Sequence, residues 1–491
     1  MFFPLCETVG IMKLFVAKLQ NIFYKTTLPQ PTFGFFFISS IVFKKTIKIL
    51  RKALVLLFFL CFSVASVAQI GFFLQNNKKR DKIPFKLVNN LPIVQIEING
   101  TPLSFILDTG VKSTILFSLE EADSLQLRNT NPVMLQGLGS GGAVEALRSL
   151  NNKVKVGSAI DNDHDLYIIF DSTLNFSPRM GIPVHGILGN EFFQNFIVKI
   201  NYATEVITIY NPKKNKLKAC RKCEDLPLNF VGGKSYFSLQ VESENASKEV
   251  TLLVDSGSSD VMWLFDAAGF IQESPPNYFK DFLGLGLSGN IFGKRTRIRK
   301  LSVGGLQLKE VNTSFPEEEA IVKARYYEDR DGSVGGGFLS RFTVTFDYAN
   351  KMVRFKKNRK FKEPFHYNMS GLTLEHQGME LVKEERQASV NTNRMNQNES
   401  LSANSISVTT EVHFSLVPKY IVAEIREGSP ADLAGIQKGD EVISINGKPC
   451  YQYKLYKLIE IFSSDEGKRI SLEIKRGDYI NKFKFTLKSV F

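Results

Sequence analysis

The stretch Phe105-Ile-Leu-Asp108-Thr109-Gly110-Val111 decides the fold, because it occurs a second time as Leu252-Leu-Val-Asp255-Ser256-Gly257-Ser258. Each copy places one carboxylate after a short apolar run and before a small hydroxyl residue and a glycine. The apolar run predicts a buried strand, and the glycine permits a tight turn after it. An acid is costly to bury there without a partner, and the second acid is the simplest partner. The two copies therefore predict one site that is built from two carboxylates.

Further features follow each copy in the same order. A glycine-rich segment begins at the same offset from each aspartate, at Gly137 and at Gly284. A later glycine follows at Gly189 and at Gly335, and its offsets from the two aspartates differ by a single residue. A tyrosine in a predicted hairpin comes next in each half, again at offsets that differ by a single residue. Matched order and spacing predict an internal duplication into two β-rich lobes.

The length of 491 residues is typical of about three domains. Alternating apolar and polar residues predict strands, so we expect a mainly β fold: a two-lobed duplicated β domain followed by a small α+β domain. A segment rich in Asn, Ser, Gln and Thr predicts a disordered insertion in that last domain. The predicted parts are residues 1–68 as an N-terminal extension and signal peptide, 83–212 as lobe 1, 226–360 as lobe 2, and 366–491 as the last domain, with the insertion at about 384–410.

The net charge of +13 does not indicate a nucleic-acid partner, because about half of it lies within residues 1–68. Lys44–Lys52 is basic, Ala53–Val64 is apolar, and Ala68 follows small residues, a pattern typical of a signal peptide that is cut after Ala68. The apolar run is too short to predict a transmembrane helix. Residues 1–43 are explained either by a start codon assigned too early or by a real extension with a membrane-associated segment.

Two close carboxylates cannot both ionise cheaply, so they share a proton and titrate as a pair. The ionised member can act as a general base on a water, and the protonated member can polarise a carbonyl. We expect the hydroxyls of Thr109 and Ser256 to hydrogen-bond within the opposite lobe. We expect Gly110 and Gly257 to leave room for the two turns to approach.

The chain resembles the aspartic protease superfamily. The resemblance rests on the two motifs Asp108-Thr109-Gly110 and Asp255-Ser256-Gly257, on Ile187-Leu-Gly189, and on its counterpart at Val334-Gly335, where Ser333 replaces one apolar residue. It covers roughly residues 83–360. It implies an aspartic endopeptidase with Asp108 and Asp255 as catalytic residues, a peptide or protein as substrate, and no metal or cofactor.

The glycine-rich segment of lobe 1 resembles the flap of retroviral-type members, and lobe 2 has such a segment at the same offset. Two flaps imply a retropepsin-like dimer fused into one chain, and Gln136–Ala146 lacks the flap tyrosine of pepsins. The flap glycines are Gly137, Gly139, Gly141, Gly142, Gly284 and Gly286.

The C-terminal segment resembles a PDZ domain through Gly428-Ser-Pro-Ala431, Ala434-Gly-Ile436, Lys438-Gly-Asp440 and Ile445-Asn-Gly447. Such domains add a peptide C-terminus to a strand and hold its carboxylate with backbone N–H groups. The resemblance implies that Gly371, Leu372, Thr373 and Leu374 form the carboxylate-binding loop and its strand. The alternative is a domain that serves for packing alone.

Two other functions compete with this prediction. A serine protease is suggested by Gly139-Ser-Gly-Gly142, but in those enzymes the general-base histidine precedes the serine, and here all five histidines follow Ser140. The second alternative is a peptide-binding or scaffolding protein that keeps the protease fold without catalysis.

Three local features complete the predictions. Cys220-Arg-Lys-Cys223 is a lone pair that favours a local disulfide over two free thiols, with a metal site least favoured. Asp161-Asn-Asp163-His-Asp165 hints at a calcium loop but departs from that pattern at Leu166 and Ser172, so we expect a solvated loop. Trp263 is expected in the core. We expect a monomer that is secreted across the inner membrane and contacts a membrane through the signal segment alone. The resemblance to proteins of Gram-negative bacteria implies the periplasm or the cell surface of such a bacterium.

Overall fold

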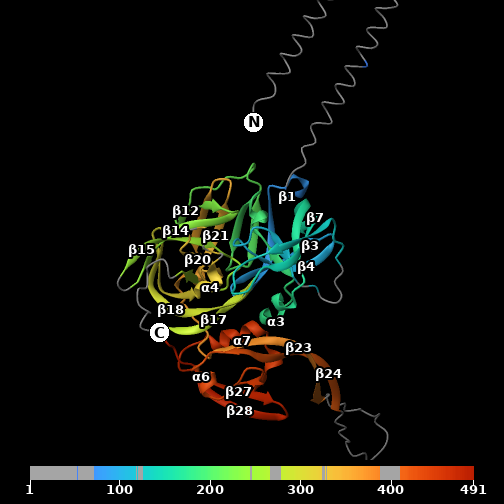
Figure 1. Cartoon of the computed structure of the whole chain (residues 1–491), viewed down its shortest axis with the longest axis vertical. Coiled ribbons are helices and arrows are strands. Elements are labelled where there is room, and N and C mark those ends of the chain that lie inside the picture. The colour runs from blue at the N-terminus through green and yellow to red at the C-terminus, as the bar shows by residue number, and fades with distance from the viewer. Residues whose placement is uncertain are drawn as a thin grey trace, which may run out of the picture. The chain divides into compact units, whose positions relative to one another are not determined.

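The computed structural model describes Lys52 and residues 71–117, 119, 125–243, 246–265, 278–322, 324, 327, 329–387 and 410–491. These residues form mostly strands with short helices, which confirms the mainly β fold (Figure 1). The predicted signal peptide, apart from Lys52, and residues 388–409 of the predicted insertion lie outside this part of the chain. Within it, no helix has the length and apolar character needed to cross a membrane.

The first aspartate stands at the end of a buried strand. Strand β3 (Leu91–Ile98) turns at Asn99-Gly100, where both residues have positive φ, into β4 (Thr101–Leu107). Strand β4 pairs in parallel with β9 (Gly186–Leu188), and β5 (Thr114–Leu116) pairs with the other side of β9. Strands β1 (Phe73–Leu74) and β2 (Arg80–Val88) precede them, so ordered strands begin before residue 83.

A long hairpin forms the flap of lobe 1. Strands β6 (Thr130–Leu135) and β7 (Val144–Val156) are its arms, and β8 (Ala159–Ile169) follows. The prediction of a solvated loop at Asp161–Asp165 was wrong, because this segment belongs to β8. Its buried residues Asp161 and His164 are hydrogen-bonded to each other, with His164 Nδ1 2.9 Å from Asp161 Oδ2. The other ring nitrogen, His164 Nε2, lies 2.8 Å from Thr114 Oγ1 of β5.

Lobe 2 repeats the strand pairing of lobe 1. The parallel pair β15–β20 aligns Leu252 with Gly332, as β4–β9 aligns Phe105 with Gly186. The strands of this lobe are β13 (Asn229–Val231), β14 (Lys234–Glu242), β15 (Ser247–Val254), β16 (Met262–Leu264), β17 (Phe279–Gly286), β18 (Gly289–Val303), β19 (Leu306–Pro316) and β20 (Gly332–Val334). Trp263 is buried in β16, as predicted.

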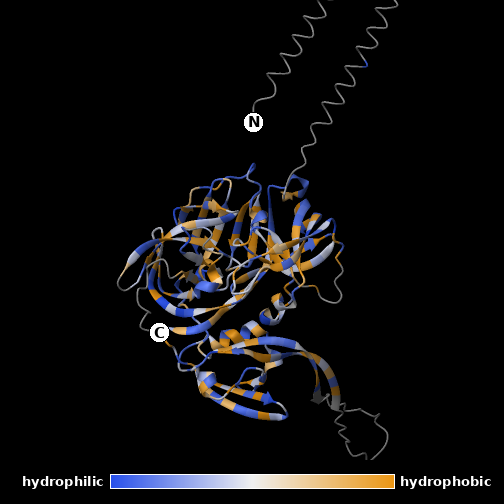
Figure 2. Cartoon of the chain, viewed as in Figure 1, coloured by the Kyte–Doolittle hydropathy of each residue, from blue (hydrophilic) through white to orange (hydrophobic). Residues whose placement is uncertain are grey.

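The two lobes share a sheet and a core. Each lobe ends in a hairpin: β10 (Ile197–Asn201) with β11 (Val206–Tyr210), and β21 (Phe342–Asp347) with β22 (Met352–Lys357). Strands β10 and β21 pair antiparallel, so the hairpins join across the molecule. One hydrophobic cluster contains buried residues of both lobes. Figure 2 shows apolar residues alternating with polar ones along the strands, as expected for sheets with one buried face.

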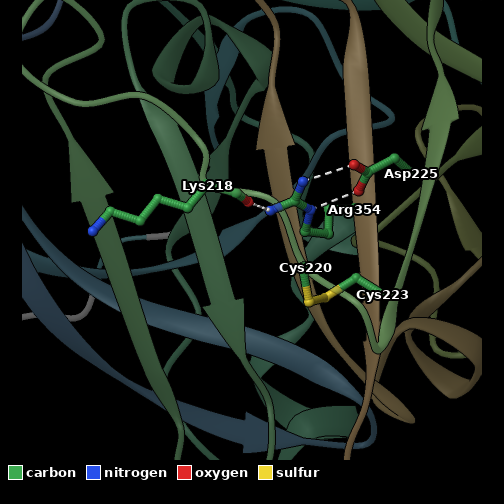
Figure 3. The surroundings of a disulfide bond; sticks show 5 residues. All are labelled: Lys218, Cys220, Cys223, Asp225 and Arg354. Carbon is green, nitrogen blue, oxygen red and sulfur yellow. Dashed lines mark hydrogen bonds and ion pairs between the residues drawn. A yellow bond between two sulfur atoms is a disulfide. The ribbon is translucent and has the colours of Figure 1, made fainter.

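A disulfide closes the linker between the lobes. Cys220 and Cys223 are bonded, which confirms the predicted local pairing (Figure 3). Cys223 begins β12 (Cys223–Pro227), the strand that pairs with β22. Arg354 of β22 donates two hydrogen bonds of 2.6 and 2.7 Å to the Asp225 carboxylate and a third to the Lys218 carbonyl. The linker is thereby tied to lobe 2.

The C-terminal part has a sheet and a core of its own. Strands β23 (Leu372–Gln387) and β24 (Thr410–Ile425) form its long hairpin, in which residues 384–387 continue β23 where the insertion was predicted to begin. The other elements are α6 (Pro430–Leu433), β25 (Glu441–Ile445), β26 (Lys448–Pro449), α7 (Leu455–Phe462), β27 (Arg469–Arg476) and β28 (Tyr479–Thr486). Helix α7 packs on β23.

Candidate active site

The two predicted aspartates meet at the junction of the lobes. Asp108 follows β4 and Asp255 follows β15, and each backbone N–H is held by the neighbouring parallel strand, at Leu188 O and Val334 O. The two carboxyl groups lie side by side: a Cβ built on Gly110 would lie 2.8 Å from Asp255 Oδ1 and 3.1 Å from Asp108 Oδ1. Asp108 is buried and Asp255 is half-buried. Two strands from different halves of the chain thus deliver one carboxyl group each to a common site.

The hydroxyls next to the aspartates lock the two turns together, as predicted. Thr109 Oγ1 donates to Val254 O at 2.7 Å and accepts from the Ser256 N–H at 3.1 Å. In return, Ser256 Oγ donates to Leu107 O at 2.7 Å and accepts from the Thr109 N–H at 3.0 Å. These four bonds are buried and cross between the lobes, so they fix the spacing of the carboxyl groups.

The glycines after the hydroxyl residues make room for the pair. A Cβ on Gly257 would lie 2.1 Å from Asp108 Oδ2, and a Cβ on Gly110 would lie 2.8 Å from the Asp255 carboxyl carbon. Each glycine N–H also donates to the aspartate of its own turn, at 2.6 Å in lobe 1 and 3.1 Å in lobe 2. A larger residue at either position would push the carboxyl groups apart.

Burial raises the pKa of both carboxyl groups. The pKa of Asp108 rises to about 8, first because burial penalises its charge and then because Asp255 is close. Burial also raises the pKa of Asp255, but the guanidinium of Arg330 and the ammonium of Lys234 oppose this rise. Lys234 lowers the pKa of both aspartates, whereas Arg330 lowers that of Asp255 alone. The balance therefore favours a negative charge on Asp255 and a proton on Asp108.

The two flaps touch each other at their tips. The Gly141 N–H donates to Ser288 O at 2.7 Å, and the Ser288 N–H donates to Leu138 O at 2.8 Å. A Cβ on Gly139 would lie 2.4 Å from the Ser288 carbonyl carbon, so this contact requires a glycine. A Cβ on Gly142 would meet nothing within 4 Å, so the packing does not require that glycine. Flap glycines of both lobes thus border the same space.

A cavity of about 810 Å³ lies beside the aspartates. Both aspartates line it, and so do flap residues of each lobe, such as Gly137 and Gly286. The four residues Gly371, Leu372, Thr373 and Leu374 line it too. The predicted catalytic and peptide-binding residues therefore border one continuous space.

A short helix of lobe 1 packs beside the predicted peptide groove. Helix α3 (Ser177–Met180) contacts α7 and β23, the strand at the edge of the C-terminal sheet to which a peptide would add. A Cβ on Gly181, just after α3, would lie 2.6 Å from Leu455 Cβ in α7. The groove is thus bounded by the lobe as well as by its own domain.

Sequence reasoning missed the two cations beside the aspartates, Lys234 and Arg330. Both line the cavity. Arg330 lies five residues before Gly335, as Val184 lies five before Gly189, so a comparison of the repeats could have shown a cation in place of an apolar residue. For Lys234 the offset from the aspartate differs between the repeats, and no such signal was present.

Comparison with known families supports both parts of this architecture. Residues 94–192 match an aspartyl protease family model, and residues 421–476 match a PDZ domain model. The first match contains Asp108 but not Asp255, so the second half of the pair rests on the geometry. Among solved structures, an aspartic proteinase from Irpex lacteus is 11% identical, and the alignment covers 58% of this chain and 99% of that one at a TM-score of 0.35. A similarity this low carries no argument about function.

Proposed function

We propose that this chain, which carries an aspartyl protease domain and a C-terminal PDZ domain, is an aspartic endopeptidase. One observation carries the proposal: the carboxyl groups of Asp108 and Asp255 lie side by side, and each comes from an equivalent turn of a duplicated lobe. The paired carboxyl groups of aspartic proteases are the standard example of such coupling. The contact, the interlocked hydroxyls and the two closing flaps together suit attack by water on a peptide bond.

The charges around the pair suggest which of the two acids is ionised and which is protonated. Asp255, which faces Lys234 and Arg330, is the ionised member and takes a proton from the attacking water. Asp108 holds the shared proton and gives it to the carbonyl oxygen, so the first product is a tetrahedral diol. When the C–N bond breaks, Asp255 gives its proton to the leaving amine and Asp108 takes a proton from a hydroxyl of the diol. The products are a carboxylic acid and an amine, and the pair again holds one proton.

The PDZ domain would bind a peptide of the substrate or of a partner. The backbone N–H of Arg426 donates to Gly371 O, which places this arginine beside the predicted carboxylate-binding loop. Its Nη2 is buried and has no hydrogen-bond partner among the residues that the structure describes. A peptide carboxylate at the loop would satisfy that nitrogen. Because the loop lines the same cavity as the aspartates, a peptide held there would be close to the catalytic pair.

The proposed location is the periplasm or the cell surface, reached across the inner membrane. Two observations support it: the signal-like pattern that ends at Ala68 and the Cys220–Cys223 disulfide. Disulfides persist in oxidising compartments. Mass spectrometry of the mature N-terminus tests this proposal, because a chain that begins before residue 44 would contradict it.

Digestion of an unfolded protein tests the proposed activity. We expect the full chain to cleave it, and we expect the Asp108→Asn variant to lose at least about a thousandfold in rate. The alternative function, a peptide-binding protein without catalysis, predicts binding of the unfolded protein with no cleavage by either form. Cleavage at equal rates by both forms would also contradict the proposal.

A further inference from the structure

The two lobes present different side chains at equivalent positions beside the aspartates. In lobe 1 the β2–β3 hairpin pairs Val88 with Leu91, and in lobe 2 the β13–β14 hairpin pairs Val231 with Lys234. Lys234 therefore occupies the place of Leu91. Both residues line the cavity.

The second difference lies next to the parallel strand pairs. Val184 stands two residues before Gly186, and Arg330 stands two residues before the equivalent Gly332. Val184 is fully buried among apolar residues, whereas the buried Arg330 lines the cavity. Lobe 2 thus replaces two apolar residues of lobe 1 with two cations on its side of the aspartate pair.

The side chain of Arg330 is held in place, but not all of its hydrogen-bond donors are used. Its Nε donates to Gly332 O at 3.0 Å, and its guanidinium lies 5.1 Å from the centre of the Phe265 ring. Its Nη2 is buried and has no hydrogen-bond partner within the described part of the chain. A buried donor without an acceptor is costly, so an anion in the cavity would stabilise this arrangement.

The charges beside the pair do not balance. Lys234 interacts electrostatically with both aspartates, yet within the described residues neither Lys234 nor Arg330 makes an ion pair at salt-bridge distance. A carboxyl pair that shares one proton carries a single negative charge, which faces two cations. Asp260 and Asp281 also line the cavity, and both form ion pairs with Arg295, at 2.9 and 2.8 Å. This side of the site therefore keeps an excess of positive charge.

We propose that Lys234 and Arg330 form a subsite that binds a carboxylate of the peptide substrate next to the scissile bond. The proposal rests on the proposed endopeptidase function and names its substrate class. The equivalent position on the lobe 1 side is formed by Leu91 and takes an apolar residue. The carboxylate comes from an Asp or Glu side chain or from the free C-terminus of a peptide, and both sources offer the same two oxygens to the cations.

A rival explanation is that Lys234 acts on the aspartates alone and favours the ionised form of Asp255. The two explanations differ in what a substitution changes. A cation that only tunes the aspartates alters the rate and its pH profile equally for acidic and neutral peptides. A cation that binds substrate alters the ratio of kcat/KM between an acidic peptide and its neutral isostere.

The test compares the full chain with its Lys234→Met and Lys234→Arg variants. Cleavage sites are first mapped in peptides from a denatured proteome. Matched synthetic peptides then carry Glu or Gln beside the cleaved bond, with a free or an amidated C-terminus. Lys309→Met is the control, because Lys309 is exposed on the same lobe and does not line the cavity. Thermal unfolding of each variant shows whether it is folded.

We expect Asp or Glu to be enriched on one side of the cleaved bond, or cleavage close to a free C-terminus. We expect the preference for Glu over Gln, or for free over amidated ends, to fall at least about tenfold in Lys234→Met. Lys234→Arg and Lys309→Met should keep it. Cleavage without any such preference, or a preference that survives Lys234→Met, would overturn the subsite.

Binding separates failure of the subsite from failure of the proposed function. If the chain cleaves no peptide, calorimetry with the Asp108→Asn variant still compares affinity for the Glu and Gln peptides and for their free and amidated ends. Tighter binding of the acidic form, lost when Lys234→Met is added, would support the subsite without catalysis. Equal affinities would overturn it.

Discussion

Lobe 1 and lobe 2 share a backbone frame but not the side chains that face the cavity. In lobe 1 the Ser104 N–H donates to His185 Nδ1 at 2.9 Å, and in lobe 2 the equivalent Thr251 N–H donates to Asp331 Oδ2 at 2.8 Å. The same structural bond is thus made by different residue types. At the cavity, by contrast, Leu91 of lobe 1 is replaced by Lys234 in lobe 2, so the difference alters the charge rather than preserving an interaction.

Duplication of the lobe therefore supplies the catalytic geometry, and divergence of the side chains between the lobes makes the surroundings of the two aspartates unequal. Two identical lobes would place both aspartates in equal surroundings, and either one could hold the proton. Here the cations lie on the lobe 2 side and favour a charged Asp255.

The largest effect is expected from filling the space between the two turns. Gly257→Ala should lower kcat at least about a hundredfold, because its Cβ would lie 2.1 Å from Asp108 Oδ2. Gly110→Ala should cost less, since the nearest atoms of Asp255 are 2.8 Å away. Steady-state kinetics with a peptide substrate measures both. Equal or reversed losses would show that the two turns are not packed as described.

The second effect concerns the interlocked hydroxyls. Ser256→Ala and Thr109→Val should each lower the free energy of unfolding by about 1–3 kcal/mol, because each leaves buried backbone groups of the other lobe unpaired. Ser256→Thr and Thr109→Ser keep the hydroxyl and serve as controls. Denaturant unfolding gives the values. If only one of the two substitutions lowered the free energy of unfolding, the two hydroxyls would not contribute equally to holding the lobes together.

The third effect is a pH-dependent change in stability. The pKa of Asp108 is raised above its unfolded value, first by burial and then by Asp255, so the folded state keeps a proton that the unfolded state loses. Stability from this group is present at low pH and is lost as pH rises from about 4 towards about 8. Asp108→Asn should therefore be more stable than the wild type at pH 8.5, by at least about 1.4 kcal/mol, and gain less at pH 4. A gain that does not grow with pH would contradict the raised pKa.

Much of this site could be predicted because its elements are local and repeated. An apolar run followed by Asp-Thr-Gly specifies a buried strand and a tight turn, and the second copy identified the partner acid. The hydroxyl contacts and the two flaps followed from the same duplication. Residues whose role depends on neighbours in sequence were therefore found without the structure.

The residues that escaped prediction depend on register between strands. Lys234 is equivalent to Leu91 because the hairpin turns match. In the sequence, however, more residues separate Lys234 from Asp255 than separate Leu91 from Asp108. The β14–β15 hairpin of lobe 2 is longer than the β3–β4 hairpin of lobe 1 in both its strands and its connection, which accounts for the difference. Asp161 and His164 were assigned to a solvated loop because polar residues usually face water. In strand β8 they are buried as mutual partners, which composition does not reveal.

One measurement tests most directly the claim that two lobes build a single catalytic site. Peptide cleavage is compared among the wild type, Asp108→Asn, Asp255→Asn and the double variant, with folding of each checked by thermal unfolding. Because the acids act as one unit, we expect each single variant to be as inactive as the double variant. Substantial activity in either single variant, or losses that multiply in the double variant, would contradict the account.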